Sequence, residues 1–125
     1  MLIAICDDSR IDLLLSKTLV IEYFRKHKLS CTVRLYENGA SLLDDVHGNT
    51  NFDIVFMDPP YGNDYEYDVL KALSHSDIID RYTIIIIEEA LNTPLDYIDE
   101  CGFETVRVKN YKTNKHIFIK LKESE

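Results

Sequence analysis

The 125-residue chain contains no tryptophan, four glycines and three prolines, and it has no long hydrophobic run. Apolar stretches such as Ile84 to Ile87 are far shorter than the ~20 residues that a membrane-spanning helix needs. The N-terminus also lacks the basic and then apolar segments that are typical of a secretory leader. We therefore expect a cytoplasmic protein without a membrane segment.

Cysteines are few and widely separated. The three thiols, Cys6, Cys31 and Cys101, are odd in number and far apart in the sequence. Disulfide scaffolds and zinc sites favour even numbers or close pairs of cysteines. The pattern therefore predicts reduced, buried thiols.

Positive charge is also scarce, because 14 Lys and Arg face 22 Asp and Glu, for a formal charge of −8. An acidic surface repels phosphate backbones, which argues against a general nucleic-acid binder. Residues 103–122 are the exception, with six basic side chains against Glu104 alone. These lysines could contact RNA phosphates, although lysines on an edge strand also discourage aggregation, and we favour the second interpretation.

The composition, 46% hydrophobic and 29% charged, fits one globular domain over residues 1–125. Strand-like and helix-like periodicities alternate along it. We expect four helices, at about 9–28, at 41–47, around 69–73 and at 93–101, and six strands, at 2–6, 31–36, 52–57, 82–87, 105–111 and 115–122.

This order of elements predicts an α/β fold. Strands separated by helices require parallel, right-handed crossovers, so the first four strands form a parallel sheet. Only Lys112, Thr113 and Asn114 separate the last two strands, which predicts an antiparallel C-terminal hairpin at one edge.

Acidic residues follow the first four predicted strands. In open parallel sheets, ligands bind beyond the carboxyl ends of the strands, where these side chains would gather. Crowded carboxylates are costly unless a cation offsets their charge, and magnesium is the hard, oxygen-preferring candidate. The alternative is that they cap helices and stay solvated. The residues are Asp7, Asp8, Glu37, Asp58, Glu88 and Glu89.

Residues 1–58 resemble a response-regulator receiver domain of the LytTR-associated type. The similarity lies in Ile3-Ala-Ile-Cys-Asp-Asp8, in Tyr36-Glu-Asn-Gly39 and in Phe52-Asp-Ile-Val-Phe-Met-Asp58. It implies that Asp7 and Asp8 bind magnesium together with Asp58, which would accept a phosphoryl group from a histidine kinase. Lys109 is the candidate for the catalytic lysine of that family.

Residues 52–122 resemble instead the C-terminal half of RsmD-type rRNA guanine methyltransferases. The similarity begins at Asp58-Pro-Pro-Tyr61 and continues through Ile84-Ile-Ile-Ile-Glu88, Cys101-Gly-Phe-Glu104 and the basic hairpin. It implies that Asp58 and the Pro59 carbonyl accept hydrogens from an exocyclic amine of the rRNA base. Pro60 completes the loop, and Tyr61 would stack on the base.

Both resemblances include residues 52–58, so we interpret the chain as a chimera, most simply an engineered one, joined at that segment. The combined families predict a doubly wound three-layer sandwich, a flavodoxin-like and Rossmann-like hybrid with strand order 2-1-3-4-6-5.

The first function hypothesis is a scaffold without evolved catalysis. The segment Cys6-Asp-Asp-Ser-Arg10 has no glycine for the close backbone approach that S-adenosylmethionine needs, so we expect no useful affinity for that donor. The alternatives are a magnesium-binding phosphoacceptor and a methyltransferase remnant that binds a base.

Overall fold

The computed structural model describes residues 1–44, 51–58 and 65–123. Its strands are β1 (Leu2–Asp7), β2 (Thr32–Tyr36), β3 (Ile54–Asp58), β4 (Ile84–Ala90), β5 (Phe103–Asn110) and β6 (Asn114–Leu121). Its helices are α1 (Arg10–Lys26), α2 (Gly39–Leu43), α3 (Tyr65–Ser74) and α4 (Asp96–Glu100). Within this part of the chain, no helix is long and apolar enough to cross a membrane.

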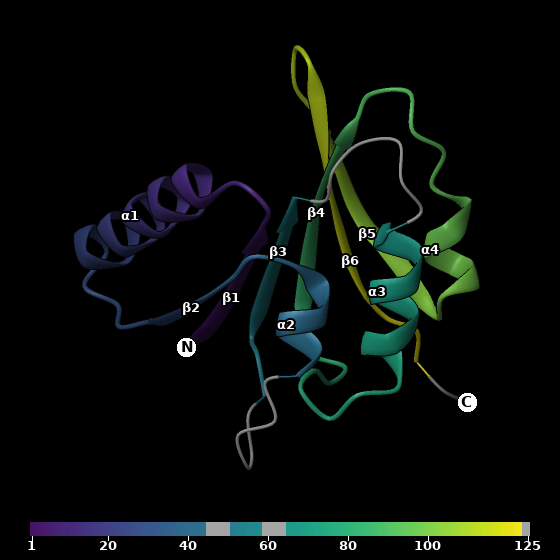
Figure 1. Cartoon of the computed structure of the whole chain (residues 1–125), viewed down its shortest axis with the longest axis horizontal. Helices are drawn as coiled ribbons and strands as arrows, with labels where there is room; N and C mark the ends of the chain where they lie inside the picture. The colour runs from purple at the N-terminus through teal and green to yellow at the C-terminus, as the bar shows by residue number, and fades with distance from the viewer. Residues whose placement is uncertain (45–50, 59–64, 124–125) are drawn as a thin grey trace.

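The six strands form one sheet in the order β2-β1-β3-β4-β6-β5 (Figure 1). The pairs β1–β2, β1–β3 and β3–β4 are parallel, while β6 is antiparallel to both β4 and β5. The predicted fold class, strand order and C-terminal hairpin are therefore confirmed.

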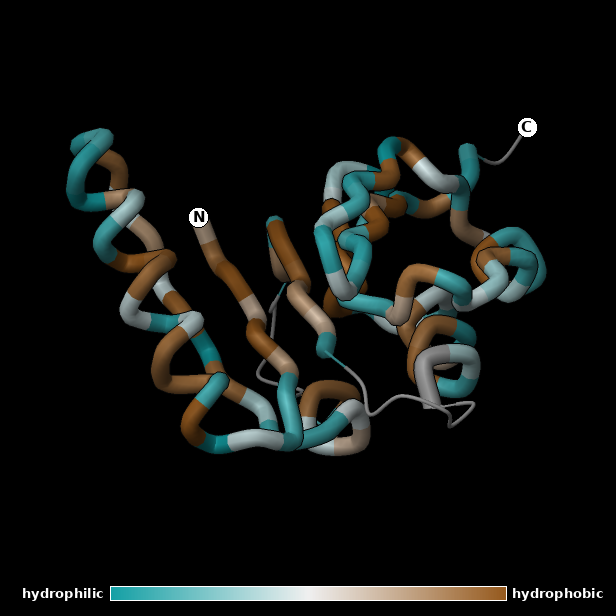
Figure 2. The backbone as a smooth tube through the Cα atoms, turned by 90° about the horizontal axis from the view of Figure 1, so that it is seen from above, coloured by the Kyte–Doolittle hydropathy of each residue, from teal (hydrophilic) through white to brown (hydrophobic). Residues whose placement is uncertain are grey.

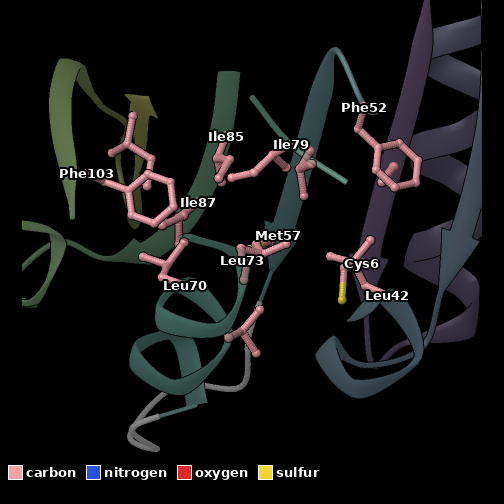
Figure 3. Close-up of a cluster of buried hydrophobic side chains, with 14 of the residues drawn as sticks. Cys6, Leu42, Phe52, Met57, Leu70, Leu73, Ile79, Ile85, Ile87 and Phe103 are labelled. Atoms are coloured by element: carbon pink, nitrogen blue, oxygen red, sulfur yellow. The ribbon is translucent and has the colours of Figure 1, made fainter. Parts of the chain in front are cut away.

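Most of the core lies on the sheet face that α2, α3 and α4 cover (Figure 1). Side chains alternate between the two faces of a strand, so Val55 and Met57 point into this layer while Ile54 and Phe56 point away. Figure 3 shows Met57, Ile85, Ile87 and other apolar side chains meeting there. Phe52 and Phe103 are completely buried in the same cluster.

In the described part of the chain, the other face carries only α1, which packs beside β1 and β2 (Figures 1 and 2). Ile3, Ile5 and Leu13 are its buried residues. Farther along the sheet, Ile86 and Phe118 point to this face and are only half-buried. Among the described residues, the sheet is thus covered fully on one face and partly on the other.

Several boundaries differ from the sequence expectations by a few residues, and two of these differences have a clear cause. β4 extends to Ala90 instead of ending at Ile87, because Glu88, Glu89 and Ala90 pair with the antiparallel β6 after the parallel partner β3 has ended. α2 begins at Gly39, since the Asn38 side chain accepts a hydrogen bond from the Ser41 amide at 2.8 Å and caps the helix.

The three cysteines are free, as predicted. Cys6 and Cys101 are buried, whereas Cys31 is only half-buried beside the smaller core.

Candidate functional site

Three carboxyl groups meet at the carboxyl ends of adjacent strands. Asp7 ends β1 and stands opposite Asp58, the last residue of β3, in the parallel register. Met57 stands opposite Ile87, so the next residue of β4, Glu88, follows at the same edge. The alternation of side chains places all three on the face that carries α1. We refer to Asp7, Asp58 and Glu88 as the carboxyl cluster.

Asp7 is held in place by its own turn. Its side chain is 5% exposed and accepts a hydrogen bond from the Ser9 amide at 2.9 Å. A second hydrogen bond joins its carboxyl group to that of Asp58. Burial raises the pKa of Asp7, while these two hydrogen bonds act in the opposite direction.

Asp58 is the central member of the cluster. Burial, then the hydrogen bond and charge of Glu88, and then Asp7 raise the pKa of Asp58 to about 8. If Asp58 were ionised, its carboxylate would be repelled by the two acidic groups beside it, Asp7 and Glu88. A proton retained on Asp58 removes this repulsion. Asp58 therefore carries a proton near neutral pH that an isolated aspartate would have lost.

His116 extends the cluster across the sheet. It stands opposite Glu88 in the β4–β6 ladder, and its Nε2 lies 3.4 Å from Glu88 Oε1. Its ring also makes edge contacts with Phe56 and Tyr111. His116 occupies an α1-facing position of β6 between aromatic rings. Its place in the alternation of residues 114–121 is the signal that could have revealed this.

The other acidic candidates lie apart from the cluster. Asp8 is exposed, and Glu37 is an exposed partner of Arg10, with 3.7 Å between charged atoms. Glu89 points to the opposite face, where its carboxylate accepts a hydrogen bond from the Tyr97 hydroxyl at 3.1 Å. Of the six acidic residues that were expected to gather at this sheet edge, only the three of the carboxyl cluster do so.

Lys109 lies far from Asp58. It is on β5, which is separated from β3 by β4 and β6, and three strand spacings of ~4.8 Å place it roughly 14 Å away. Its ammonium lies 5.3 Å from the Tyr111 ring centroid. The structure therefore does not bring this candidate lysine to the cluster. The substrate-binding candidates Pro59, Pro60 and Tyr61 fall outside the described residues.

No group of three or more histidine, cysteine, aspartate or glutamate side chains is arranged to hold a metal ion in residues 1–44, 51–58 and 65–123. The magnesium site expected at Asp7, Asp8 and Asp58 remains a prediction. Asp8 lies on the exposed side of the turn, so only two of its three residues are in contact.

Comparison with solved structures places this sheet in a class. A conserved hypothetical protein of Streptococcus pyogenes superposes with a TM-score of 0.64 at 17% identity, over 95% of this chain and 71% of the other. A ribosomal protein L11 methylase of Lactobacillus delbrueckii gives 0.60 at 13% identity, over 98% of this chain and 70% of the other. The fold is therefore that of the α/β methyltransferases.

The family follows from the sequence. The family described as conserved hypothetical protein 95 matches residues 16–120, and the chain belongs to it. An uncharacterised methylase of Rickettsia prowazekii is 35% identical over 72 residues, which are 58% of this chain. The aligned part spans only 30% of that relative's length.

These findings correct the chimera hypothesis. One family covers residues 16–120 without interruption, so it crosses the proposed junction at 52–58 and includes most of the supposed receiver half. The interpretation of residues 1–58 as a receiver half is therefore wrong, and the phosphoacceptor role of Asp58 and the histidine kinase partner lose the resemblance on which they rested. Of the three segments that suggested it, residues 52–58 form a buried parallel strand ending in an aspartate, a pattern that different doubly wound folds share.

Proposed function

We propose that this chain is an RsmD-like methyltransferase that holds an exocyclic amine of a nucleobase, with rRNA as its substrate class, at Asp58. The observation that carries the proposal is the position of Asp58 at the end of a central strand, immediately before Pro59-Pro60-Tyr61, in a chain of this family. The methylase name of the Rickettsia relative supports the same reaction class.

The carboxyl cluster suits an amine acceptor. An exocyclic amine donates two N–H bonds, and a carboxylate oxygen of Asp58 would accept one of them. When the nitrogen bonds to a methyl group it must release one proton. Only the ionised form of Asp58 can receive that proton. Burial, Glu88 and Asp7 raise the pKa of Asp58 to about 8, so the proton transfer is favoured as the pH rises toward that value.

The methylase relatives imply S-adenosylmethionine as the methyl donor, and the described residues do not fit its amino-acid carboxylate. The Ser9 amide after β1, which could bind a carboxylate, already donates to Asp7. The Asp12 amide in the first turn of α1 donates to the Ser9 hydroxyl at 3.3 Å. Asp7 and Asp8 would also repel that carboxylate, whereas they would attract the ammonium and sulfonium groups of the same donor. We therefore propose that Asp7, together with Asp58, serves the binding of the nucleobase amine and not the binding of the methyl donor.

Binding of guanosine-containing RNA tests the proposal. A short rRNA-like stem-loop should bind the full chain, and Asp58→Ala should weaken binding at least tenfold because it removes the acceptor of the amine hydrogen bond. Replacing guanosine in the RNA by inosine, which lacks the exocyclic amine, should cause a similar loss of affinity for the unsubstituted protein.

The matched control is Asp77→Asn, an exposed acid outside the cluster, which should bind as the parent does. Transfer of a radiolabelled methyl group from S-adenosylmethionine to the same RNA should be measured in parallel. Equal affinity for the guanine and inosine RNAs, or an Asp58→Ala variant that binds normally, would contradict the proposal.

A further inference from the structure

Helix α1 has apolar side chains around most of its circumference. Nine of its 17 residues are apolar, yet Leu13 alone among them is buried. Ile11, Leu15, Leu19 and Tyr23 follow one another at four-residue spacing and therefore form a single ridge along the helix. Their exposed fractions are 79%, 57%, 60% and 59%. A helix that is apolar on several sides is normally covered on several sides.

An apolar groove of about 270 Å³ runs beside this ridge. Leu19, Val20 and Phe24 of α1 form one wall, and Ile54, Phe56 and Ile86 of the sheet form the other. Across the described residues, no helix covers β4 and β6 on this face (Figures 1 and 2). Leu19 belongs to both features, so the ridge and groove form one continuous surface.

We propose that a second copy of this chain covers this surface, the α1 ridge of each copy packing into the groove of the other about a twofold axis. A twofold interface needs one surface that is complementary to itself, and here the same surface offers both the projecting and the receiving part. Ridges that pack into grooves are the usual way in which two helices meet.

The area of the surface agrees with a stable dimer. An exposed aliphatic or aromatic side chain contributes on the order of 100 Å² when it is covered. The four ridge residues and Leu14 together contribute on the order of 500 Å², and the half-buried groove walls add to this, against the ~800 Å² per partner of a standard interface. Monomeric proteins rarely leave an apolar patch of more than a few hundred Å² in water.

Charge also favours a second copy, in an antiparallel arrangement. Asp12 lies in the first turn of α1, and Arg25 and Lys26 lie in the last. Arg10, the basic residue of the first turn, is paired with Glu37 of its own chain. Two antiparallel α1 helices would therefore bring Asp12 of each copy toward the basic end of the other, which supports complementary pairing.

Sedimentation velocity on the full chain across a concentration series tests the interface. The expected species has twice the 14.6 kDa mass of the chain. Leu15→Glu and Leu19→Glu should each raise the dimer dissociation constant at least tenfold, and because both side chains are exposed, far-ultraviolet circular dichroism should not change. Tyr82→Ser, which removes a 73% exposed ring outside the ridge and groove, is the matched control and should leave the dimer intact.

A charge exchange tests the antiparallel arrangement. Asp12→Lys and Lys26→Asp should each weaken the dimer, and the double variant should recover part of the loss. A chain that stays monomeric at the highest soluble concentration overturns the proposal, as does a dimer that both Leu→Glu variants leave unchanged. Binding of an added amphipathic helical peptide in the groove of a monomeric chain would also overturn it.

Discussion

Asp7 and Asp58 stand directly opposite each other in the parallel ladder between β1 and β3, and their carboxyl groups are hydrogen-bonded. Residues that are 51 positions apart in the sequence thus form one acidic pair, in which Asp7 is buried and Asp58 is half-buried. The sheet edge leaves this pair no room to separate, because both side chains project from strand ends whose backbones are joined by the ladder. The pair therefore retains a proton instead of two full charges.

The raised pKa of Asp58 makes folding stability depend on pH. The folded chain keeps a proton on Asp58 up to about pH 8, whereas the unfolded chain releases it near the ordinary aspartate pKa of 3.8. The stabilisation that this proton provides is complete below the pKa of Asp58 in the unfolded chain. It is lost as the pH rises through the pKa of Asp58 in the folded chain. Asp58→Asn has no such proton, so its stability should gain on that of the parent between pH 4 and pH 8.

Urea unfolding of both proteins at intervals across this range provides the measurement. Some dependence should persist in Asp58→Asn, because burial also raises the pKa of Asp7. Asp77→Asn should follow the parent. Parallel curves for Asp58→Asn and the parent would show that Asp58 is ionised in the folded chain.

Thr83 joins the segments that precede β3 and β4 through its hydroxyl group. The hydroxyl donates to the Phe52 carbonyl at 2.6 Å and accepts from the Asp80 amide at 3.0 Å, and the residue is 2% exposed. Thr83→Val keeps the shape but leaves both groups without this partner, so it should destabilise the fold by about 1–3 kcal/mol. Chemical denaturation measures the change. Thr83→Ser retains the hydroxyl and should lose clearly less.

Gly39 allows α2 to approach α3. A Cβ atom built on Gly39 would lie 2.3 Å from Val69 Cγ2, closer than two carbon atoms can approach. Gly39→Ala should therefore cost about 1–3 kcal/mol through overpacking. The double variant with Val69→Ala removes the clashing methyl group. Its loss of unfolding free energy should therefore be smaller than the sum of the losses in the two single variants. Strict additivity in the thermal or urea midpoints would contradict this contact.

Lys115 fixes the segment after β4 from within the protein. Its side chain is 7% exposed, and its ammonium donates to the Thr93 carbonyl at 2.7 Å. Lys115→Met fills a similar volume but leaves the carbonyl without this donor, so we expect a loss of about 1.5–3 kcal/mol. Lys112→Met, at an exposed position of the same hairpin, should change stability by less than about 0.5 kcal/mol. Equal stabilities of the two variants would disprove the buried role.

Much of the fold could be predicted from local patterns. Ile84–Ile87 and Ile117–Ile119 are β-branched segments whose alternation matches the two faces of the sheet, and the short connection at 112–114 allowed only a hairpin. The origin of the chain could not be read in the same way. The segment 52–58 has the pattern of any buried parallel strand with an acid at its end, so its likeness to receiver domains reflected shared physics and misled the interpretation.

Local amino-acid patterns indicated where the strands lie to within a few residues, which side of each strand is apolar and that Asp7, Asp58 and Glu88 lie at or beyond the ends of apolar segments. Only the tertiary structure decided that these three acids are neighbours, that Glu37 and Lys109 lie apart from them and that His116 reaches Glu88. The physical reason is that strand order and register are set by packing between residues far apart in the chain. The proton on Asp58 depends on that packing, because burial and neighbouring charge act only after the strands have come together.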